Sequence, residues 1–276
     1  MKTKIVVDSS SSLYALPGVD FACVPLKIVT DEQEYLDDGT LDAVDMARSL
    51  RTYKGKTSTS CPNVADWLAA YEGAEQIFVA TITGTLSGSY NAALLAAEEY
   101  KETHPEARVF VLDSLSAGPE LRLLAERLRD LVRIGMEFDE ICEKAAAYRD
   151  RMNTYFVLDN LETLRKNGRL SGIKALVAST LSIKPVMAGT MDGRIEQIGQ
   201  GIGIRKGLQK MADAVVRNVA RPEEKTLMIT HCNCPERAES VKRMVTSKVS
   251  VKDVVIMDTA GVSSMYANDG GVIVTI

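Results

Sequence analysis

Short apolar runs alternate with amphipathic segments along most of the chain. The runs at 76–80 and 108–112 are short and mostly apolar, which is typical of buried strands. The segment 119–135 instead spaces its leucines three and four positions apart, which predicts a helix with one apolar face. A chain in which strands and helices alternate in this way is expected to form an α/β fold.

The same pattern assigns the remaining elements. Strands are expected at 4–7, 21–29, 76–80, 108–112, 154–158, 183–187, 194–198, 225–229, 253–257 and 271–276. Helices are expected at 42–53, 62–71, 88–101, 119–135, 138–153, 161–166, 204–219 and 235–245, and the helix that begins at 138 has an alternative end near 150. Pro62 and Pro235 suit a first helical position, where the missing N–H is not needed.

The order of the elements predicts two α/β domains. Residues 1–153 alternate strand and helix regularly, which favours a mainly parallel sheet. Residues 154–276 bring strands in closer succession, with a turn at 191–193, and predict a mixed α+β domain. We expect a ligand-binding cleft between the two domains.

Polar residues follow three strands of the first domain, at 8–10, 83–89 and 113–114. The carboxyl ends of parallel strands meet at one edge of a sheet, so these segments are expected to lie together. The segment 83–89 also opens a helix, and the first four N–H groups of a helix lack intrahelical partners. It contains Gly and hydroxyl residues and no charged residue or His, which indicates a site that holds an anion by neutral donors.

Other interpretations of this loop are weaker. A phosphate-binding P-loop needs GxxxxGK[ST], but Gly84 and Gly88 enclose three residues and no Lys follows. A nucleophile elbow needs GxSxG, and Ser87 lacks both glycines. One alternative stays open, in which Thr83, Ser87 and Ser89 only cap the helix.

Composition narrows the class of protein. The chain has 276 residues, a net charge of −4 and a pI near 5.4, which gives no sign of a nucleic-acid partner. No apolar stretch is long enough to insert stably in a membrane, and the apolar run at 5–7 is too short for a signal peptide. Five cysteines form an odd, sparse set, which favours a cytoplasmic location.

Three further motifs carry candidate chemistry. His231-Cys232-Asn233-Cys234 has no second ligand pair, so we interpret it as a strand–helix junction and expect no metal site. Gly199–Gly203 resembles a dinucleotide fingerprint but lacks its third glycine. Asp8 or Asp113 at a strand end would suit a hydrolase or phosphotransfer enzyme, which is the alternative function.

Several segments, in order along nearly the whole chain, resemble the DegV family of bacterial fatty-acid-binding proteins. They lie at 7–9, 24–27, 35–39, 59–62, 86–90, 111–114, 161–170, 182–185 and 192–193. The most specific are Thr59-Ser60 before Pro62, the turn Ser87-Gly88-Ser89-Tyr90, and Asn167-Gly168-Arg169. Each motif is short, and their number and order make the resemblance specific.

The resemblance implies two α/β domains with a long-chain fatty acid between them and no cofactor. It implies that Thr59 and Ser87 hold the carboxylate, that Gly88 and Ser89 supply backbone donors, and that Ser60 is a further binding residue. The choice of Thr59 over Thr57 rests on aligning Pro62. Burying each CH₂ contributes about 0.8 kcal/mol, so the tail should dominate affinity and the hydroxyls should set orientation.

The resemblance also implies a partner and two further site residues. Some members carry the acyl group for a fatty acid kinase, and these usually have a His where this chain has Tyr266. A fatty acid kinase is thus a candidate partner although that His is absent, and Tyr266 is a candidate contact near the head group. Arg169 matches a family motif, with a surface cation at a helix end as its alternative. We expect a lipid carrier rather than an enzyme.

Overall fold

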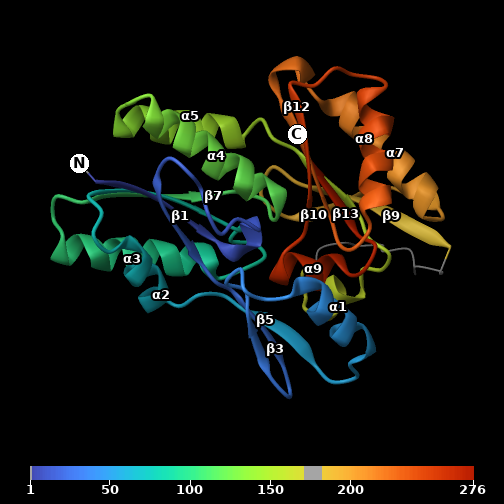
Figure 1. The fold of residues 1–276 in the computed structure, drawn as a ribbon, viewed down its shortest axis with the longest axis horizontal. Coiled ribbons are helices and arrows are strands. Elements are labelled where there is room, and N and C mark those ends of the chain that lie inside the picture. Colours follow the sequence, from blue (N-terminus) through green and yellow to red (C-terminus); the bar gives the residue numbers. More distant parts are fainter. Residues whose placement is uncertain (1, 171–181) are drawn as a thin grey trace.

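A computed structural model describes residues 2–170 and 182–276 (Figure 1). The first sheet is parallel throughout and has the strand order β2-β1-β6-β7. Its strands are β1 (Thr3–Asp8), β2 (Asp20–Val24), β6 (Gln76–Thr81) and β7 (Arg108–Asp113). Its helices are α2 (Val64–Tyr71), α3 (Ser89–Thr103), α4 (Pro119–Arg133) and α5 (Phe138–Arg149).

Alternation along the strands of this sheet places helices on both faces. Ile5 and Phe78 pack against α4 and α5, whereas Val6 and Val79 pack against α2 and α3. Successive side chains of a strand point to opposite faces, so continuous apolar strands require cover on both sides. The expected parallel domain is therefore confirmed.

The second sheet has six strands in the order β10-β9-β8-β13-β11-β12, and only β11 and β12 are parallel neighbours. Its strands are β8 (Thr154–Val157), β9 (Ile183–Gly189), β10 (Ile195–Ile202), β11 (Thr226–His231), β12 (Asp253–Asp258) and β13 (Val272–Thr275). Helices α7 (Ile204–Asn218) and α8 (Pro235–Thr246) cover one face, and the short helices α6 (Glu162–Lys166) and α9 (Gly261–Ala267) lie in the connections. This mixed domain confirms the predicted fold class.

A third, small antiparallel sheet was not expected from the sequence. It consists of β4 (Glu34–Leu36), β3 (Lys27–Thr30) and β5 (Thr57–Ser60), and α1 (Ala43–Thr52) connects β4 to β5. Ile28 and Met46 from this unit pack against Val262 and Met265 of α9. The third sheet thereby connects the N-terminal half of the chain to a helix of the C-terminal half.

Two predicted elements were wrong. The segment 21–29 is not one strand, because Pro25, which cannot donate to a strand ladder, separates β2 from β3, and these belong to different sheets. Pro62 does not begin a helix. Helix α2 begins at Val64, and Asn63 caps it by accepting from the Asp66 N–H, with Asp66 accepting in return from the Asn63 N–H.

The two halves of the chain share a core. Helix α4 packs on the first sheet, and its neighbours also include Met228, Val255 and Met257 of the second sheet. Helix α5 ends at Arg149 with Asp150 as its C-cap, as in the alternative with the earlier end, and Asn153 exchanges backbone hydrogen bonds with Ile276 beside β8. The exact boundary between residues 153 and 154 stays a prediction.

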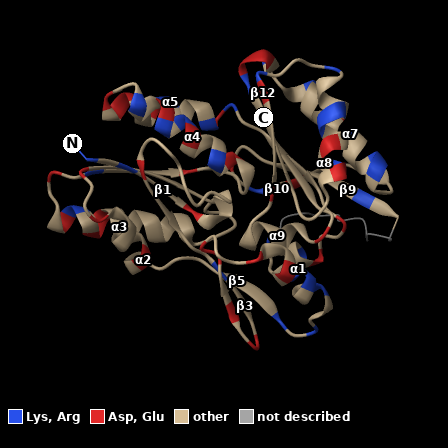
Figure 2. Cartoon of the chain, in the orientation of Figure 1, with Lys and Arg blue, Asp and Glu red and all other residues tan. Residues whose placement is uncertain are grey.

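Charged side chains lie mainly on the outer helices and loops, and the strands at the centre of both sheets carry few of them (Figure 2). Two 3₁₀ helices, η1 (Ser9–Ser11) and η2 (Pro222–Glu224), complete the described elements. Among the residues that the structure describes, no helix combines the length and the apolar character needed to cross a membrane.

Candidate functional site

The carboxyl ends of β1, β6 and β7 meet, as the sequence predicts. Asp8 at the end of β1 accepts hydrogen bonds from the Ile82 N–H (2.9 Å) and from the Ser89 hydroxyl (2.7 Å). Asp113 at the end of β7 accepts from the Gly84 N–H at 3.1 Å. The two carboxylates therefore fix the shape of the loop between β6 and α3.

These contacts bear on the alternative function, a hydrolase or phosphotransfer enzyme that uses Asp8 or Asp113. Asp8 is fully buried, and burial raises the pKa of its carboxyl while hydrogen bonds from Ser10, Ser89 and the Ile82 N–H oppose that rise. Neither Asp8 nor Asp113 lines the cavity described next. The geometry thus gives both carboxylates a role in holding the loop.

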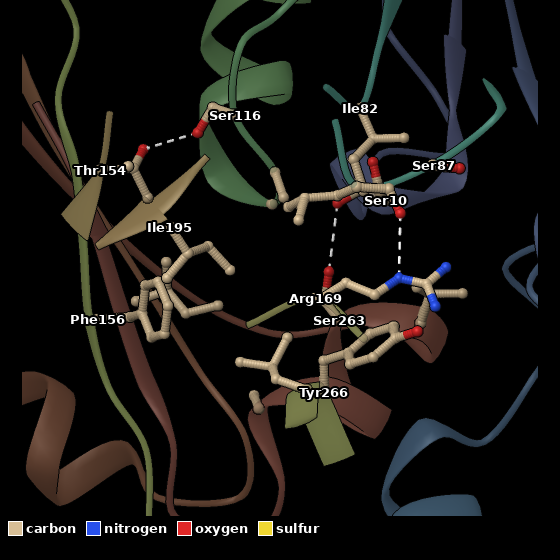
Figure 3. Close-up of a pocket in the computed structure, with 18 of the residues that line it drawn as sticks. Ser10, Ile82, Ser87, Ser116, Thr154, Phe156, Arg169, Ile195, Ser263 and Tyr266 are labelled. Carbon is tan, nitrogen blue, oxygen red and sulfur yellow. Dashed lines mark hydrogen bonds between the residues drawn. The ribbon is translucent and has the colours of Figure 1, made fainter. Parts of the chain in front are cut away.

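A cavity of about 120 Å³ lies between the two halves of the chain (Figure 3). Its walls are mostly apolar. Apolar side chains come from the first half (Leu26, Ile82 and Leu115) and from the second half (Phe156, Leu158 and Ile195). This is where a ligand-binding cleft between the two domains was expected, and the lining suits a hydrocarbon.

Hydroxyl groups and one guanidinium gather at one end of this cavity. The hydroxyls of Thr59 and Tyr266 lie 2.9 Å apart, and Ser87 and Arg169 line the same end. Arg169 Nε donates to the carbonyl oxygen of Leu86 at 3.1 Å, so this side chain joins the second half of the chain to the β6–α3 loop. The end offers several hydroxyl donors and the positive charge of Arg169, a combination that suits a carboxylate.

A tight turn of the second half also closes over the loop. The Thr85 hydroxyl donates to the carbonyl of Gly193, between β9 and β10. Gly193 has φ +78°, and a Cβ there would lie 2.2 Å from the Thr83 hydroxyl oxygen. Only glycine satisfies both the left-handed backbone and this close approach.

The structure distributes the predicted site residues unevenly. Thr59 and Ser87 line the cavity, as do Arg169 and Tyr266. Thr59 lies within β5 opposite Ile28, and the next helix, α2, begins at Val64 rather than at Pro62. The roles of all these residues in binding stay predictions.

The other three predicted residues lie off the cavity wall. Ser60 is exposed, and its hydroxyl donates to the Cys61 carbonyl at 3.3 Å. Gly88 is the N-cap of α3, and a Cβ there would lie 3.1 Å from Cys61 Sγ, so the end of β5 and the start of α3 are neighbours. Ser89 donates its hydroxyl to Asp8, and its N–H donates to the Ser87 hydroxyl at 3.3 Å. The Ser87 hydroxyl thus accepts one N–H at the start of α3, although the N-cap residue Gly88 has no side chain to cap the helix, and the capping alternative stays untested.

Sequence reasoning missed a group at the opposite end of the cavity. Ser116 donates to the Thr154 hydroxyl at 3.1 Å, and both residues line the cavity (Figure 3). Behind them lies Glu120, whose pKa burial raises to about 7, against the opposing effect of hydrogen bonds from Thr154 and Ser116. A Glu in the first turn of an amphipathic helix is normally solvent-exposed, so the sequence carries no signal for this cluster.

The remaining candidate motifs, at 231–234 and 199–203, contribute to the fold. His231 ends β11 and Pro235 begins α8, which confirms the strand–helix junction, and all five cysteines are free. Residues 199–202 lie in β10, and a Cβ at Gly201 would lie 2.3 Å from the Gly207 N, so this glycine permits strand–helix packing. Within residues 2–170 and 182–276, no group of three or more His, Cys, Asp or Glu side chains is placed to hold a metal.

Known proteins share this architecture over their full length. A family model described as "Uncharacterised protein, DegV family" matches residues 2–276. A DegV domain-containing protein of Streptococcus pneumoniae is 35% identical over 277 residues, covering 99% of this chain and 98% of the relative.

Two solved structures are similar throughout. A DegV family protein from Ruminococcus gnavus, refined with vaccenic acid, has a TM-score of 0.94 and 39% identity, with 100% of both chains covered. The Streptococcus pneumoniae fatty acid kinase (Fak) B3 protein, loaded with linoleic acid, has a TM-score of 0.92 and 34% identity, covering 100% of this chain and 99% of that one.

The fold and the site define a class of two-domain α/β proteins with an apolar cavity between the domains and hydroxyl groups at one end of it. The family match and the full-length relatives identify the class further. The chain belongs to the DegV family.

Proposed function

We propose that the protein binds a long-chain fatty acid in the cavity between its domains. The carboxylate lies at the end formed by Thr59, Ser87, Arg169 and Tyr266, and the acyl chain runs past Phe156 and Ile195. The observation that carries this proposal is a cavity with mostly apolar walls and, at one end, the hydroxyls of Thr59 and Tyr266 beside Ser87 and Arg169. The solved relatives with vaccenic and linoleic acid support the same ligand class.

The energetics agree with this division of roles. Burying a chain of about sixteen carbons contributes on the order of 10 kcal/mol before ordering costs, so the acyl chain provides most of the affinity. Hydroxyl donors to a carboxylate contribute about 1.5–3 kcal/mol each, because one partner is charged. The polar end therefore selects an acid over an uncharged lipid and fixes its direction.

Backbone donors have a smaller part in this arrangement than the family motif suggests. Because Thr59 lies on a strand and Gly88 lies off the cavity wall, the side-chain hydroxyls are the principal donors that we assign. The loop that precedes α3 supports them through Ser87.

Palmitic acid and cetyl alcohol test the proposal directly, because they share a chain and differ in the head group. Delipidated protein should bind palmitic acid at one site and bind the alcohol at least about tenfold more weakly. Combining Thr59→Val with Ser87→Ala should reduce this preference without unfolding the protein. Equal binding of acid and alcohol by the wild type would contradict the carboxylate site.

We further propose that the protein is a carrier in the cytoplasm and not itself a catalyst, with a fatty acid kinase as its partner. Its similarity to the fatty acid kinase B3 protein supports that partner, and its five free cysteines support a reducing compartment. Tyr266 can donate a hydrogen bond to the carboxylate without supplying a charge. A phosphorylation assay with such a kinase, ATP and the loaded protein tests the partner. Formation of acyl phosphate on other carriers but not on this protein would count against it.

A further inference from the structure

The end of the cavity that lies away from Thr59 is formed by a row of residues that are neighbours across the strands of the second sheet. Thr275 of β13 is opposite Thr154 of β8, and Ile195 of β10 is opposite Gly189 of β9. Because Tyr155 is opposite Ala188, Thr154 and Gly189 are also neighbours across their strands. Thr154, Gly189 and Ile195 all line the cavity, so this row faces the ligand space.

A second chain segment completes the end. Ser116, which precedes α4, donates to Thr154 across the cavity at 3.1 Å (Figure 3). Both side chains are 7% exposed, so they meet in the interior and close the space between sheet and helix.

Hydrogen bonds to two further buried residues hold the Ser116–Thr154 pair in place. The Thr154 hydroxyl lies 2.7 Å from Glu120 Oε2 and 2.7 Å from the Thr275 hydroxyl. Glu120 is 4% exposed and Thr275 is fully buried. Moving Thr154 aside would leave buried polar groups without partners, which is costly, so the wall resists displacement.

Space continues beyond this wall. A smaller cavity of about 30 Å³ is lined by Glu120, Arg149 and Asn153. Ser116 and Thr154, together with Leu115 and Gly189, line both cavities and therefore separate them. A chain that passed the pair would enter a polar, partly charged space.

The width of the cavity beside the Ser116–Thr154 pair depends on Gly189, which has no side chain. A Cβ added at Gly189 would meet only the Thr154 carbonyl oxygen, at an ordinary 3.9 Å. Gly189 lies in a strand and its φ is not positive, so larger residues suit its backbone. A side chain there would fill the ligand space rather than strain the fold.

We propose that Ser116 and Thr154 are the end stop for the acyl chain and set the longest fatty acid that the protein accepts. The inference rests on the proposed function, which places the carboxylate at the Thr59 end. The methyl terminus packs against this pair and against Ile195, and Gly189 provides the room for it.

A competition between chain lengths tests the end stop. Delipidated wild type, Thr154→Ala, Gly189→Val and Thr275→Val are each offered an equimolar mixture of even-numbered saturated fatty acids from lauric to behenic acid. The bound acids are then extracted and quantified by mass spectrometry. Thr275→Val is the control, because it removes a brace without changing a residue of the cavity wall.

Thr154→Ala should enrich acids longer by one carbon pair about fourfold, because the space gained beside Glu120 lets roughly one of the two added CH₂ groups lie in apolar surroundings. Gly189→Val should shift the bound set to shorter acids, and Thr275→Val should keep the wild-type set. Stoichiometric binding with the wild-type length distribution in Gly189→Val overturns the end stop and leaves the proposed function intact, and it does so even if Thr154→Ala fails to fold. Absence of fatty acid from the wild type itself would instead overturn both.

Discussion

The hydroxyl groups of Thr59 and Tyr266 lie 2.9 Å apart although 207 positions separate the two residues in the sequence. Thr59 belongs to β5 of the small sheet, and Tyr266 belongs to α9 of the C-terminal half. Ile28 and Val262 pack in the core directly beside this contact. The polar end of the cavity therefore exists only when both halves of the chain are folded together.

Replacing Thr59 by Val should weaken fatty acid binding about tenfold while the fold is kept. The change removes one hydroxyl donor to a charged group and preserves the side-chain volume on a strand. Titration of delipidated protein with palmitic acid measures the loss. Thr57→Val is the matched control on the same strand, because Thr57 does not line this cavity and the variant should bind as the wild type does. Equal loss in both variants would show that the strand, not the hydroxyl, matters.

Changing Arg169 separates its charge from its position. Arg169→Gln should weaken binding on the order of tenfold at low salt, because the part-buried guanidinium faces the carboxylate end. Arg169→Lys keeps the charge but loses the Nε contact with Leu86, so it should recover part of the affinity and show salt dependence. If the Lys variant binds no better than the Gln variant, the charge is not what Arg169 contributes.

Removing the Ser89 hydroxyl should affect stability rather than binding. Ser89→Ala deletes a buried donor to Asp8 and should lower the free energy of unfolding by about 1–3 kcal/mol. Chemical denaturation measures this loss, and palmitic acid titration in native buffer should give an unchanged Kd. A stable variant with weakened binding would assign Ser89 to the ligand instead.

Glu120 should make stability depend on pH. Burial raises its pKa from 4.5 to about 7, so the folded protein binds a proton more tightly than the unfolded chain. Its favourable contribution is present below pH 4.5 and is lost as pH rises through about 7. The loss is on the order of 3 kcal/mol.

The variant Glu120→Gln isolates this effect. Asp8 and Asp37 also have raised pKa values, and their contributions cancel when the variant is compared with the wild type. The unfolding free energy of the wild type relative to Glu120→Gln should therefore fall as pH rises between 4.5 and 7. A constant difference across that range would show that Glu120 does not titrate there.

The alternation of apolar runs and amphipathic segments was enough to predict two α/β domains. The spacing of apolar residues within each strand or helix shows which of its faces must be buried. The strand ends at Asp8 and Asp113 could be placed together because the carboxyl ends of parallel strands meet at one edge of the sheet. The break at Pro25 is also visible in the sequence, yet it specifies only that the strand is interrupted. Whether the second part joins a new sheet depends on packing against α9.

The two ends of the cavity differ in how well the sequence predicts them. Thr59 and Ser87 occur in short motifs, so a family resemblance identified them. Ser116, Thr154 and Glu120 lie in three different elements and form a site only through the register of β8 and the position of α4. Contacts of this kind depend on tertiary structure, and no local pattern indicates them.

Mass spectrometry of the native protein, before and after delipidation, tests the central claim most directly. The protein purified from a bacterial host should carry one fatty acid per chain, lose that mass on delipidation, and regain it when palmitic acid is added. Protein that has no bound acyl chain and takes up none of the added acid would contradict the account.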